Sequence, residues 1–472
     1  MSFRPGPVPG NPDQILTAAQ MRAAEQGLIA DGTSVGELMQ RAGRGAADWV
    51  WRMAAGRSVT VLCGPGNNGG DGYVIAQVLD ERGGQVTVVA AADPQTDAAR
   101  NARDLFQGQV LGPSANPQGE VLVDCLFGTG LTRPLSDEMF ALLERLATSH
   151  RQRIAVDLPS GVQSDSGAFL NSGLPPFDLT LALGAWKFAH LLMPAAAGMG
   201  LTRLVPIGVT AFDGAAQVIA RPELASPAAN VHKYTRGLLG VIGGAMPGAA
   251  ILAARAAQHA GAGYVKLLGE CGVTPPDLVH DTRPLAESLN DKRFNALLIG
   301  PGLGRESSSR EALTLALAEQ KPAVLDADAL MLLAPRMLAE HIAPLIVTPH
   351  EGELKALEAA FGCSGASSKV DRALALAKIC RAVVVAKGPD SVVAAPDGRI
   401  AFSGRASSWL STAGTGDVLA GTIASRLASG ADPFAAACQG AWLHGEAARL
   451  AGPAFTASEL AECIKAAYAA TL

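Results

Sequence analysis

The chain has 472 residues, 49% hydrophobic and 17% charged, so it has apolar material for two or three packed domains and is not globally disordered. Lys and Arg number 38 against 43 Asp and Glu, and the net charge of −5 gives no bulk attraction to nucleic acid or an anionic membrane. Seven scattered cysteines, without CxxC spacing, disfavour a disulfide framework or a zinc site and favour a reducing compartment. The first 30 residues show no secretion signal, so we expect a cytoplasmic protein.

A helical segment over 17–52 opens the first half, and short apolar runs then alternate with helical patterns. This alternation is typical of a parallel sheet with crossover helices. The expected strands are 58–63, 85–91, 120–125, 153–158 and 178–183, and helical patterns between them include 72–82 and 136–149.

The second half continues the alternation, with strands expected at 237–243, 263–268, 296–300, 323–327, 344–348 and 382–387. A hairpin is predicted over 391–402, turning at Asp397-Gly398. Segment 237–254 lacks charge over 18 positions, but its five Gly and Pro247 indicate a buried strand, a glycine loop and a helix start rather than a membrane span. The Pro-, Ala- and Ser-rich stretch 221–230 separates two domains, which we place at 1–220 and 225–472.

Residues 63–72 read CGPGNNGGDG and lie between an expected strand and a helical pattern. The five Gly let the backbone approach a ligand closely, and the helix start offers N–H groups and a positive dipole end to an anion such as a pyrophosphate. A tight turn is the structural alternative. Turns do not need this density of Asn and Asp side chains, so the pattern favours a binding loop.

Two later strand ends in the first half carry carboxylates: Asp124 in VLVDC, before LFGTGLTRP, and Asp157 in RIAVD, before LPSGV. The carboxyl ends of strands in a doubly wound sheet lie along one edge, so Asn68, Asp124, Asp157 and Ser160 are expected to converge. Their oxygen ligands suit an alkali or alkaline-earth cation and not zinc. Either Asp could instead be a helix N-cap.

The first half resembles the NAD(P)H-hydrate epimerase family over about 15–210, in TAAQMRAAEQ (17–26), LMQRAG (38–43), GPGNNGGDGYVIA (64–76), VDCLFGTGL (123–131) and VDLPSGV (156–162). The resemblance implies a Rossmann-like three-layer α/β/α domain that interconverts the R and S epimers of hydrated NADH or NADPH. It also implies a potassium ion held by Asn68, Asp124 and Ser160. The implied substrate contacts are Asn67, Asn68, Gly69, Gly70, Asp71, Gly128, Thr129, Gly130, Leu131, Thr132, Arg133, Pro134 and Asp157.

Asp157 is our candidate for proton transfer at the epimerising carbon, since a carboxylate is the only convergent base visible. Lys187, in LGAWKFAHL, loosely matches a lysine of that family. The alternative for Lys187 is a surface lysine with a solvated head group.

The second half contains STAGTGDVLAG (411–421), in which Gly414, Gly416 and Asp417 stand where a loop enters a helix. Backbone N–H groups there can bind phosphate oxygens, and Asp417 can accept a proton from a hydroxyl whose oxygen attacks a phosphoryl group. A helix cap is the alternative for Asp417. KGPDS (387–391) could pack against a nucleotide or only join two strands, and VTPHEGEL (347–354) puts His350 at a strand's carboxyl end.

The NAD(P)H-hydrate dehydratase family is resembled over about 230–450, in this order: HKYTRG (232–237), GGAMPGAAILAA (243–254), GAGYVKL (261–267), IGPGLG (299–304), LDADAL (325–330), VTPHEGEL, KGPDS and STAGTGDVLAG. The resemblance implies a ribokinase-like α/β/α domain in which ADP, with Mg²⁺, phosphorylates the hydroxyl of the S hydrate. ATP is not excluded as donor. Phosphate then leaves and the ring double bond is restored. The implied hydrate contacts are Ala249, Gly302 or Gly304, His350 and Asp417, and the implied nucleotide contacts are Lys387, Gly388, Pro389, Asp390, Ser391 and Gly416.

Together the two halves predict a two-domain α/β enzyme that repairs hydrated NAD(P)H, with Asp157 and Asp417 as catalytic residues. The expected partners are the hydrates and ADP, with no nucleic acid or membrane, and the chain is expected to form a homo-oligomer. One alternative is a ribokinase-like vitamin kinase, which would leave the N-terminal glycine-asparagine loop unexplained. Another makes the N-terminal half a non-catalytic binding or scaffolding module.

Overall fold

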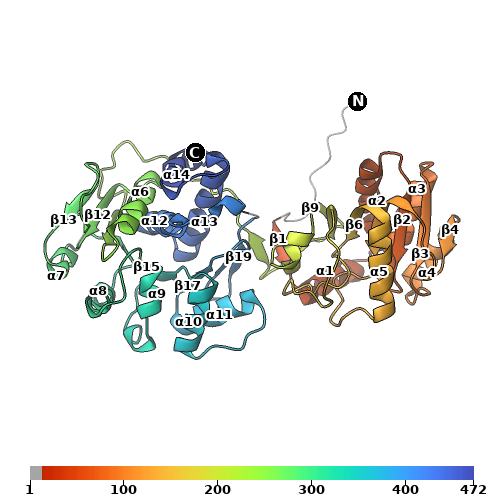
Figure 1. Ribbon diagram of the computed structural model, residues 1–472, viewed down its shortest axis with the longest axis horizontal. Coiled ribbons are helices and arrows are strands. Elements are labelled where there is room, and N and C mark those ends of the chain that lie inside the picture. Colours follow the sequence, from red (N-terminus) through yellow and green to blue (C-terminus); the bar gives the residue numbers. More distant parts are fainter. Residues whose placement is uncertain (1–12, 270, 405) are drawn as a thin grey trace. The chain divides into compact units, whose positions relative to one another are not determined.

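The computed structural model describes residues 13–269, 271–404 and 406–472; the first twelve residues, to which the secretion-signal expectation partly refers, lie outside it. The chain folds as two compact units that meet in sequence between Ala216 and Gln217 (Figure 1). Within the described residues, no helix is both long enough and apolar enough to cross a membrane.

The first unit opens with β1 (Gln14–Leu16) and two helices, α1 (Ala18–Ala30) and α2 (Val35–Ala54). The single helical segment expected over 17–52 is therefore two helices. The break contains Gly32, whose φ of +98° is incompatible with a continuing right-handed helix. The hydroxyl of Ser34 then accepts from the backbone N–H of Glu37 in a capping box that begins α2.

Seven parallel strands form the sheet of the first unit, in the order β4-β3-β2-β5-β6-β7-β9. Their bounds are β2 (Val59–Cys63), β3 (Val86–Ala90), β4 (Gln109–Leu111), β5 (Gly119–Cys125), β6 (His150–Val156), β7 (Leu179–Leu183) and β9 (Leu201–Val205). The crossover helices include α3 (Asn67–Glu81), α4 (Asp97–Leu105) and α5 (Asp137–Ser149). The strand order reverses between β2 and β5, and ligands bind at the carboxyl side of such a reversal.

Helices cover both faces of this sheet. Val61 and Cys63 of β2 pack with α2 and α3, whereas the intervening Leu62 packs with α5 (Figure 1). The result is the three-layer Rossmann-like arrangement that was expected. After β7 the chain forms β8 (Trp186–Lys187), which pairs with β1, and two short 3₁₀ helices, η1 (Phe188–His190) and η2 (Ala195–Gly198).

The second unit is built on the strands β13-β12-β11-β14-β15-β16-β17, all parallel, followed by the antiparallel β18 and β19 and by β10. Their bounds are β10 (Ala216–Val218), β11 (Leu238–Ile242), β12 (Tyr264–Leu268), β13 (Val279–Asp281), β14 (Ala296–Ile299), β15 (Ala323–Leu325), β16 (Leu345–Val347), β17 (Val383–Ala386), β18 (Val392–Ala394) and β19 (Ile400–Phe402). Six strands, each two to five residues long, were not anticipated from the sequence: β1, β4, β8, β9, β10 and β13.

The helices of the second unit are α6 (Pro247–His259), α7 (Leu285–Leu289), α8 (Ser307–Ala318), α9 (Asp328–Leu332), η3 (Pro335–Met337), α10 (Glu351–Phe361), α11 (Lys369–Cys380), η4 (Ser408–Leu410), α12 (Thr415–Ala428), α13 (Pro433–Ala451) and α14 (Ala457–Ala469). Helices α6, α12 and α13 pack on one face of the sheet, and Figure 1 shows α8 to α11 on the other side. The prediction for 237–254 is confirmed, because β11 ends at Ile242 and Pro247 opens α6. The predicted α/β class is confirmed for both units.

Candidate functional site

The glycine-asparagine loop follows β2 and enters α3 five residues earlier than the helical pattern suggested, at Asn67. Its N-cap is Gly66, which offers no side chain, and the first backbone N–H groups of a helix have no partner within it. The glycines have a packing reason besides ligand approach: a Cβ at Gly64 would strike the Leu126 carbonyl, and one at Gly72 would lie 2.8 Å from the Cys63 thiol. The start of α3 presents its first backbone N–H groups at the edge of the sheet where β2 and β5 diverge.

Asp157 follows β6 and is held by two other segments. Its Oδ2 accepts from the backbone N–H of Thr129 at 2.7 Å, and its Oδ1 accepts from Lys187 Nζ at 2.5 Å. Lys187 is 1% exposed, so the surface-lysine alternative is wrong. Burial would raise the pKa of the Asp157 carboxyl, but Lys187 and Thr129 hold that pKa below its ordinary value. Asp157 is thus a buried carboxylate that stays ionised.

Gly128 shows that three strand ends meet. A Cβ on this residue would lie 2.6 Å from Asp157 Oδ2 and 3.3 Å from Asn68 Oδ1. The loops after β2, β5 and β6 therefore converge, as predicted from their positions at the carboxyl ends of the strands.

Asp124 and Ser160 are also brought together, in the expected cation-binding set. The Ser160 hydroxyl donates to Asp124 Oδ1 at 2.7 Å, and the Ser160 backbone N–H donates to Oδ2 at 2.9 Å. Asn68, the third member, has a buried side-chain amide whose oxygen and nitrogen both lack a hydrogen-bond partner. A buried amide without partners is costly, so its presence beside this loop indicates a ligand for it.

Two further carboxyl groups interact electrostatically with Asp157, and one of them was missed by the sequence reasoning. Burial, reinforced by the charges of Asp157 and Glu25, raises the pKa of Asp71 well above its ordinary value. Burial also raises the pKa of Glu25, which lies on α1, against the opposing charge of Lys187. The site therefore contains two carboxyl groups whose pKa values are shifted in opposite directions, that of Asp157 downward and that of Asp71 upward, and such a difference can separate base from acid.

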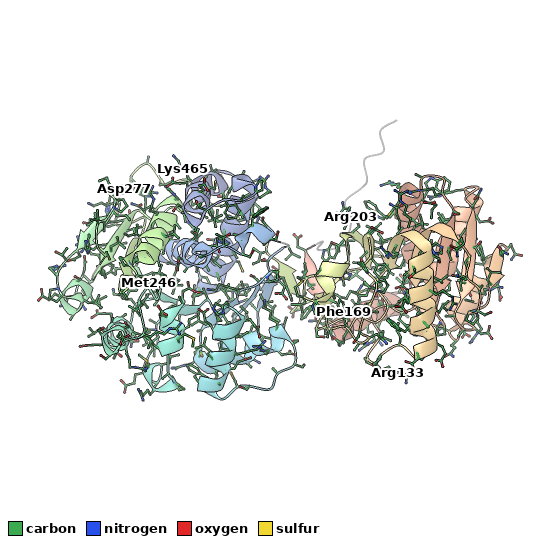
Figure 2. The ribbon with its side chains drawn as sticks, in the orientation of Figure 1. Arg133, Phe169, Arg203, Met246, Asp277 and Lys465 are labelled. Atoms are coloured by element: carbon green, nitrogen blue, oxygen red, sulfur yellow. The ribbon has the colours of Figure 1, made fainter. Side chains whose placement is uncertain are left out.

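The predicted substrate segment 128–134 divides in space. The backbone of Thr129 contacts Asp157, but the Leu131 side chain is buried in the core against α5. Thr132, Arg133 and Pro134 are exposed, and Figure 2 shows the Arg133 side chain at the surface of the first unit.

In the second unit, α12 begins at Thr415 after Gly414, whose φ of +89° places it in the left-handed region. Beside this helix start is a cavity of about 1070 Å³. The predicted nucleotide residues Lys387, Gly388, Pro389, Ser391 and Gly416 line it. Asp390 does not line the cavity; it is buried, and its Oδ1 accepts from Lys369 Nζ at 2.6 Å.

Asp417 lies in the first turn of α12, near a buried charge cluster. Lys387 Nζ donates to Asp326 Oδ1 at 2.6 Å and is 3.8 Å from Glu353 Oε2. Burial and the negative charge of Asp326 raise the pKa of Asp417 to about 7, against the opposing charge of Lys387. Asp417 is therefore half-ionised near neutral pH, which suits a group that accepts a proton there.

The predicted hydrate residues surround the same edge of the sheet. Gly302 approaches α6 closely, since a Cβ on it would lie 3.1 Å from that of Ala249. Gly304 donates its backbone N–H to Asp328, whose charge acts on Asp417. His350 is the N-cap of α10, and its Nδ1 accepts from the backbone N–H of Gly352 at 3.0 Å.

The sequence reasoning missed Glu25, His190, Asp326 and Glu353 and left Lys187 undecided. One signal for Lys187 was present, because it is the only lysine among the first 216 residues. Asp326 and Glu353 stand in DADAL and VTPHEGEL, at strand ends already singled out.

Comparison with known proteins gives matches to both units. Residues 239–467 match the family described as NAD(P)H-hydrate dehydratase, and residues 35–189 match the family described as YjeF-related protein N-terminus. The bifunctional NAD(P)H-hydrate repair enzyme of Salinibacter ruber is 32% identical, over 93% of this chain and 92% of that protein. The enzyme of the same description from Moorella thermoacetica is 33% identical, over 88% of each.

The chain belongs to the family of bifunctional NAD(P)H-hydrate repair enzymes. This confirms the family, the enzyme class and the function that the motifs implied. Among solved structures, an ADP/ATP-dependent NAD(P)H-hydrate dehydratase from Bacillus subtilis, co-crystallised with ATP and Mg²⁺, is 27% identical, with a TM-score of 0.47, over 53% of this chain and 95% of its own. Relatives that match along both units favour neither the vitamin-kinase nor the scaffolding alternative.

Proposed function

We propose that this family member divides repair between its units, with 1–220 exchanging the epimers of hydrated NAD(P)H and 225–472 dehydrating the S epimer at the expense of ADP. The proposal rests on two aspartates, one in each unit. Each lies at the edge of its sheet where the carboxyl ends of the parallel strands are found. Asp157 is kept ionised by Lys187, and Asp417, with its pKa of about 7, stands at a helix start beside the large cavity.

In the first unit, Asp157 is the base for proton transfer at the hydroxyl-bearing carbon. Asp71, whose pKa is raised by burial, is the proposed acid that returns a proton. The N–H groups at the start of α3 bind the anionic part of the dinucleotide, and the 128–131 loop holds both substrate and Asp157.

A potassium ion would be held by Asn68, Asp124 and Ser160. The partnerless amide of Asn68 and the all-oxygen donors of the other two support this assignment. When bound, the ion supplies positive charge beside the anionic dinucleotide. Epimer exchange should be faster in potassium than in sodium chloride at equal ionic strength; equal rates would contradict the ion assignment without touching the rest.

In the second unit, Asp417 accepts the proton of the substrate hydroxyl while the hydroxyl oxygen bonds to the terminal phosphorus of ADP. AMP leaves, and the hydroxyl group of the hydrate has become a phosphate ester. Phosphate then departs with the carbon–oxygen bonding electrons, and loss of a ring proton restores the double bond. N–H groups at the start of α12 bind the transferred phosphoryl group.

ADP is the proposed donor, together with Mg²⁺. Among the residues that the structure describes, no group of three or more His, Cys, Asp or Glu side chains is arranged to hold a metal ion. We propose that Mg²⁺ arrives with the nucleotide phosphates, as it commonly does. Cytoplasmic location and self-association stay predictions from the sequence.

The test is to incubate the protein with hydrated NADH and ADP, ATP or neither, and to follow the recovery of absorbance by the reduced ring. Pure S hydrate should be restored with ADP alone. Pure R hydrate should be restored only when the first unit is active. The Asp157→Ala variant should therefore fail to restore the R hydrate but still restore the S hydrate. Restoration of R hydrate at the normal rate by Asp157→Ala would remove Asp157 from the exchange.

A further inference from the structure

His190 contacts the main chain of Asp157 and has no role in the proposed reaction. It ends η1 and is 4% exposed, with its ring edge-on to Trp186 at a centroid distance of 5.6 Å. A buried imidazole beside a catalytic carboxylate is either filling space or holding a particular geometry. Its hydrogen bonds decide between these possibilities.

Both ring nitrogens of His190 contact main-chain groups whose roles are fixed. Nδ1 is 2.9 Å from the backbone nitrogen of Lys187, which can only donate, and Nε2 is 2.8 Å from the carbonyl oxygen of Asp157, which can only accept. Nδ1 must therefore be bare and Nε2 must carry the proton. Nδ1 also lies 3.3 Å from the Lys187 carbonyl, a contact that a bare nitrogen makes without a hydrogen bond.

Burial, followed by the positive charge of Lys187, lowers the pKa of His190 to about 4. The ring is thus neutral at physiological pH and keeps one tautomer. This property suits a fixed bridge and not a proton carrier.

The backbone of Asp157 needs such a bridge. Its φ of +67° lies in the left-handed region, which non-glycine residues occupy under strain. Its N–H donates to the carbonyl of Leu181 in β7 at 2.7 Å, so the sheet hydrogen bonding continues up to Asp157 and the turn begins at this residue. The carbonyl of Asp157 itself, at the other end of this residue, accepts the hydrogen bond from His190.

We propose that His190 is a positioning residue for epimer exchange: its neutral imidazole joins the main chains of Asp157 and Lys187 and keeps the carboxylate aimed at the hydroxyl-bearing carbon. This inference rests on the proposed role of Asp157. The essential contact is the Nε2–H donated to the Asp157 carbonyl, because it fixes the strained turn, whereas the contact of Nδ1 only orients the ring.

Two amide substitutions separate the two contacts. The Gln side-chain nitrogen is three bonds from Cβ, as Nε2 of His is, so His190→Gln keeps a donor for the Asp157 carbonyl. The Asn side-chain oxygen is two bonds from Cβ, as Nδ1 is, so His190→Asn keeps only the acceptor for Lys187. Epimer exchange is measured with pure R hydrate, and His150→Gln is the matched control, because His150 is buried in the same unit and bonds Thr60 and Leu146 instead.

We expect kcat for exchange to fall ~100-fold in His190→Asn with KM nearly unchanged, since a small misplacement of a catalytic group costs about that factor. His190→Gln should retain most of the rate, and His150→Gln should match the wild type. Equal losses in the Gln and Asn variants, or a change confined to KM, would overturn the proposal. If Asp157→Asn retains exchange, the role of Asp157 itself fails; if it abolishes exchange while His190→Asn is fully active, only the present inference fails.

A measurement on the unmodified protein covers the case in which the variants do not fold. Nitrogen-15 spectra of the histidine rings should show His190 with its proton on Nε2 from pH 5.5 to 8. A ring that carries its proton on Nδ1, or that becomes doubly protonated within this range, would overturn the proposal.

Discussion

Replacing Lys187 by Met should make epimer exchange sensitive to acid. Lys187 Nζ lies 2.5 Å from Asp157 Oδ1, and the pair is almost completely buried. In the wild type, the lysine overcomes the effect of burial and holds the pKa of Asp157 below its ordinary value. The exchange rate of the wild type should therefore change little between pH 5 and pH 8. In the Met variant only burial and Thr129 remain, so the pKa of Asp157 rises.

The size of the effect follows from the ion pair. Two unit charges about 4 Å apart at an effective dielectric constant of ~20 attract by about 4 kcal/mol. Since about 1.4 kcal/mol is a factor of ten, the carboxyl becomes ~1000-fold harder to ionise without the lysine. Only an ionised Asp157 can accept a proton, so exchange by the variant should be slower at pH 5 than at pH 8, whereas exchange by the wild type should not.

The assay follows conversion of pure R hydrate to S hydrate by chromatography at several pH values, after subtracting the uncatalysed exchange. Arg82→Met is a matched control, because it removes an exposed cation that pairs with Asp48 in the same unit. Its pH profile should coincide with that of the wild type. A Lys187→Met variant with full activity at pH 5 would refute the claim that the ion pair keeps Asp157 ionised.

Three further predictions concern the two catalytic edges. Asp417→Asn should lower dehydration by ~10²–10⁴-fold and leave epimer exchange intact, because only the second unit loses its proton acceptor; loss of both activities in a folded protein would contradict the division between units. Dehydration by the wild type should rise with pH, reach half its maximum at about pH 7 and level off only above that, because Asp417 must be ionised; a flat profile from pH 5.5 to 8 would argue against it as the base. Gly128→Ala should slow exchange, since its methyl group would lie 2.6 Å from Asp157 Oδ2, whereas Gly112→Ala meets nothing within 4 Å and is the control. Equal exchange rates in those two variants would show that the 128 loop does not crowd the carboxylate.

Local patterns in the sequence were sufficient to predict the alternation of strands and helices and the polar groups at the strand ends. Periodicity and glycine loops are local properties, and parallel strands necessarily bring their carboxyl ends to one edge. This is why the convergence of Asn68, Asp157 and the 128 loop could be expected from the sequence. The helix start at Asn67 was placed too late, because glycines that usually interrupt a helix here allow it to pack closely against its neighbours.

Only the tertiary structure decided which charges meet. Lys187 is 30 residues from the carboxylate that it keeps ionised, and Lys387 is 61 residues from Asp326. No spacing rule relates such residues, because their contact depends on how separate loops pack and on how much water that packing removes. The strained turn at Asp157 and the fixed tautomer of His190 follow from the same packing. The residue types and their order along the chain thus identify the chemistry, whereas burial and distance are what support the proposed roles of particular side chains as base, acid or positioning residue.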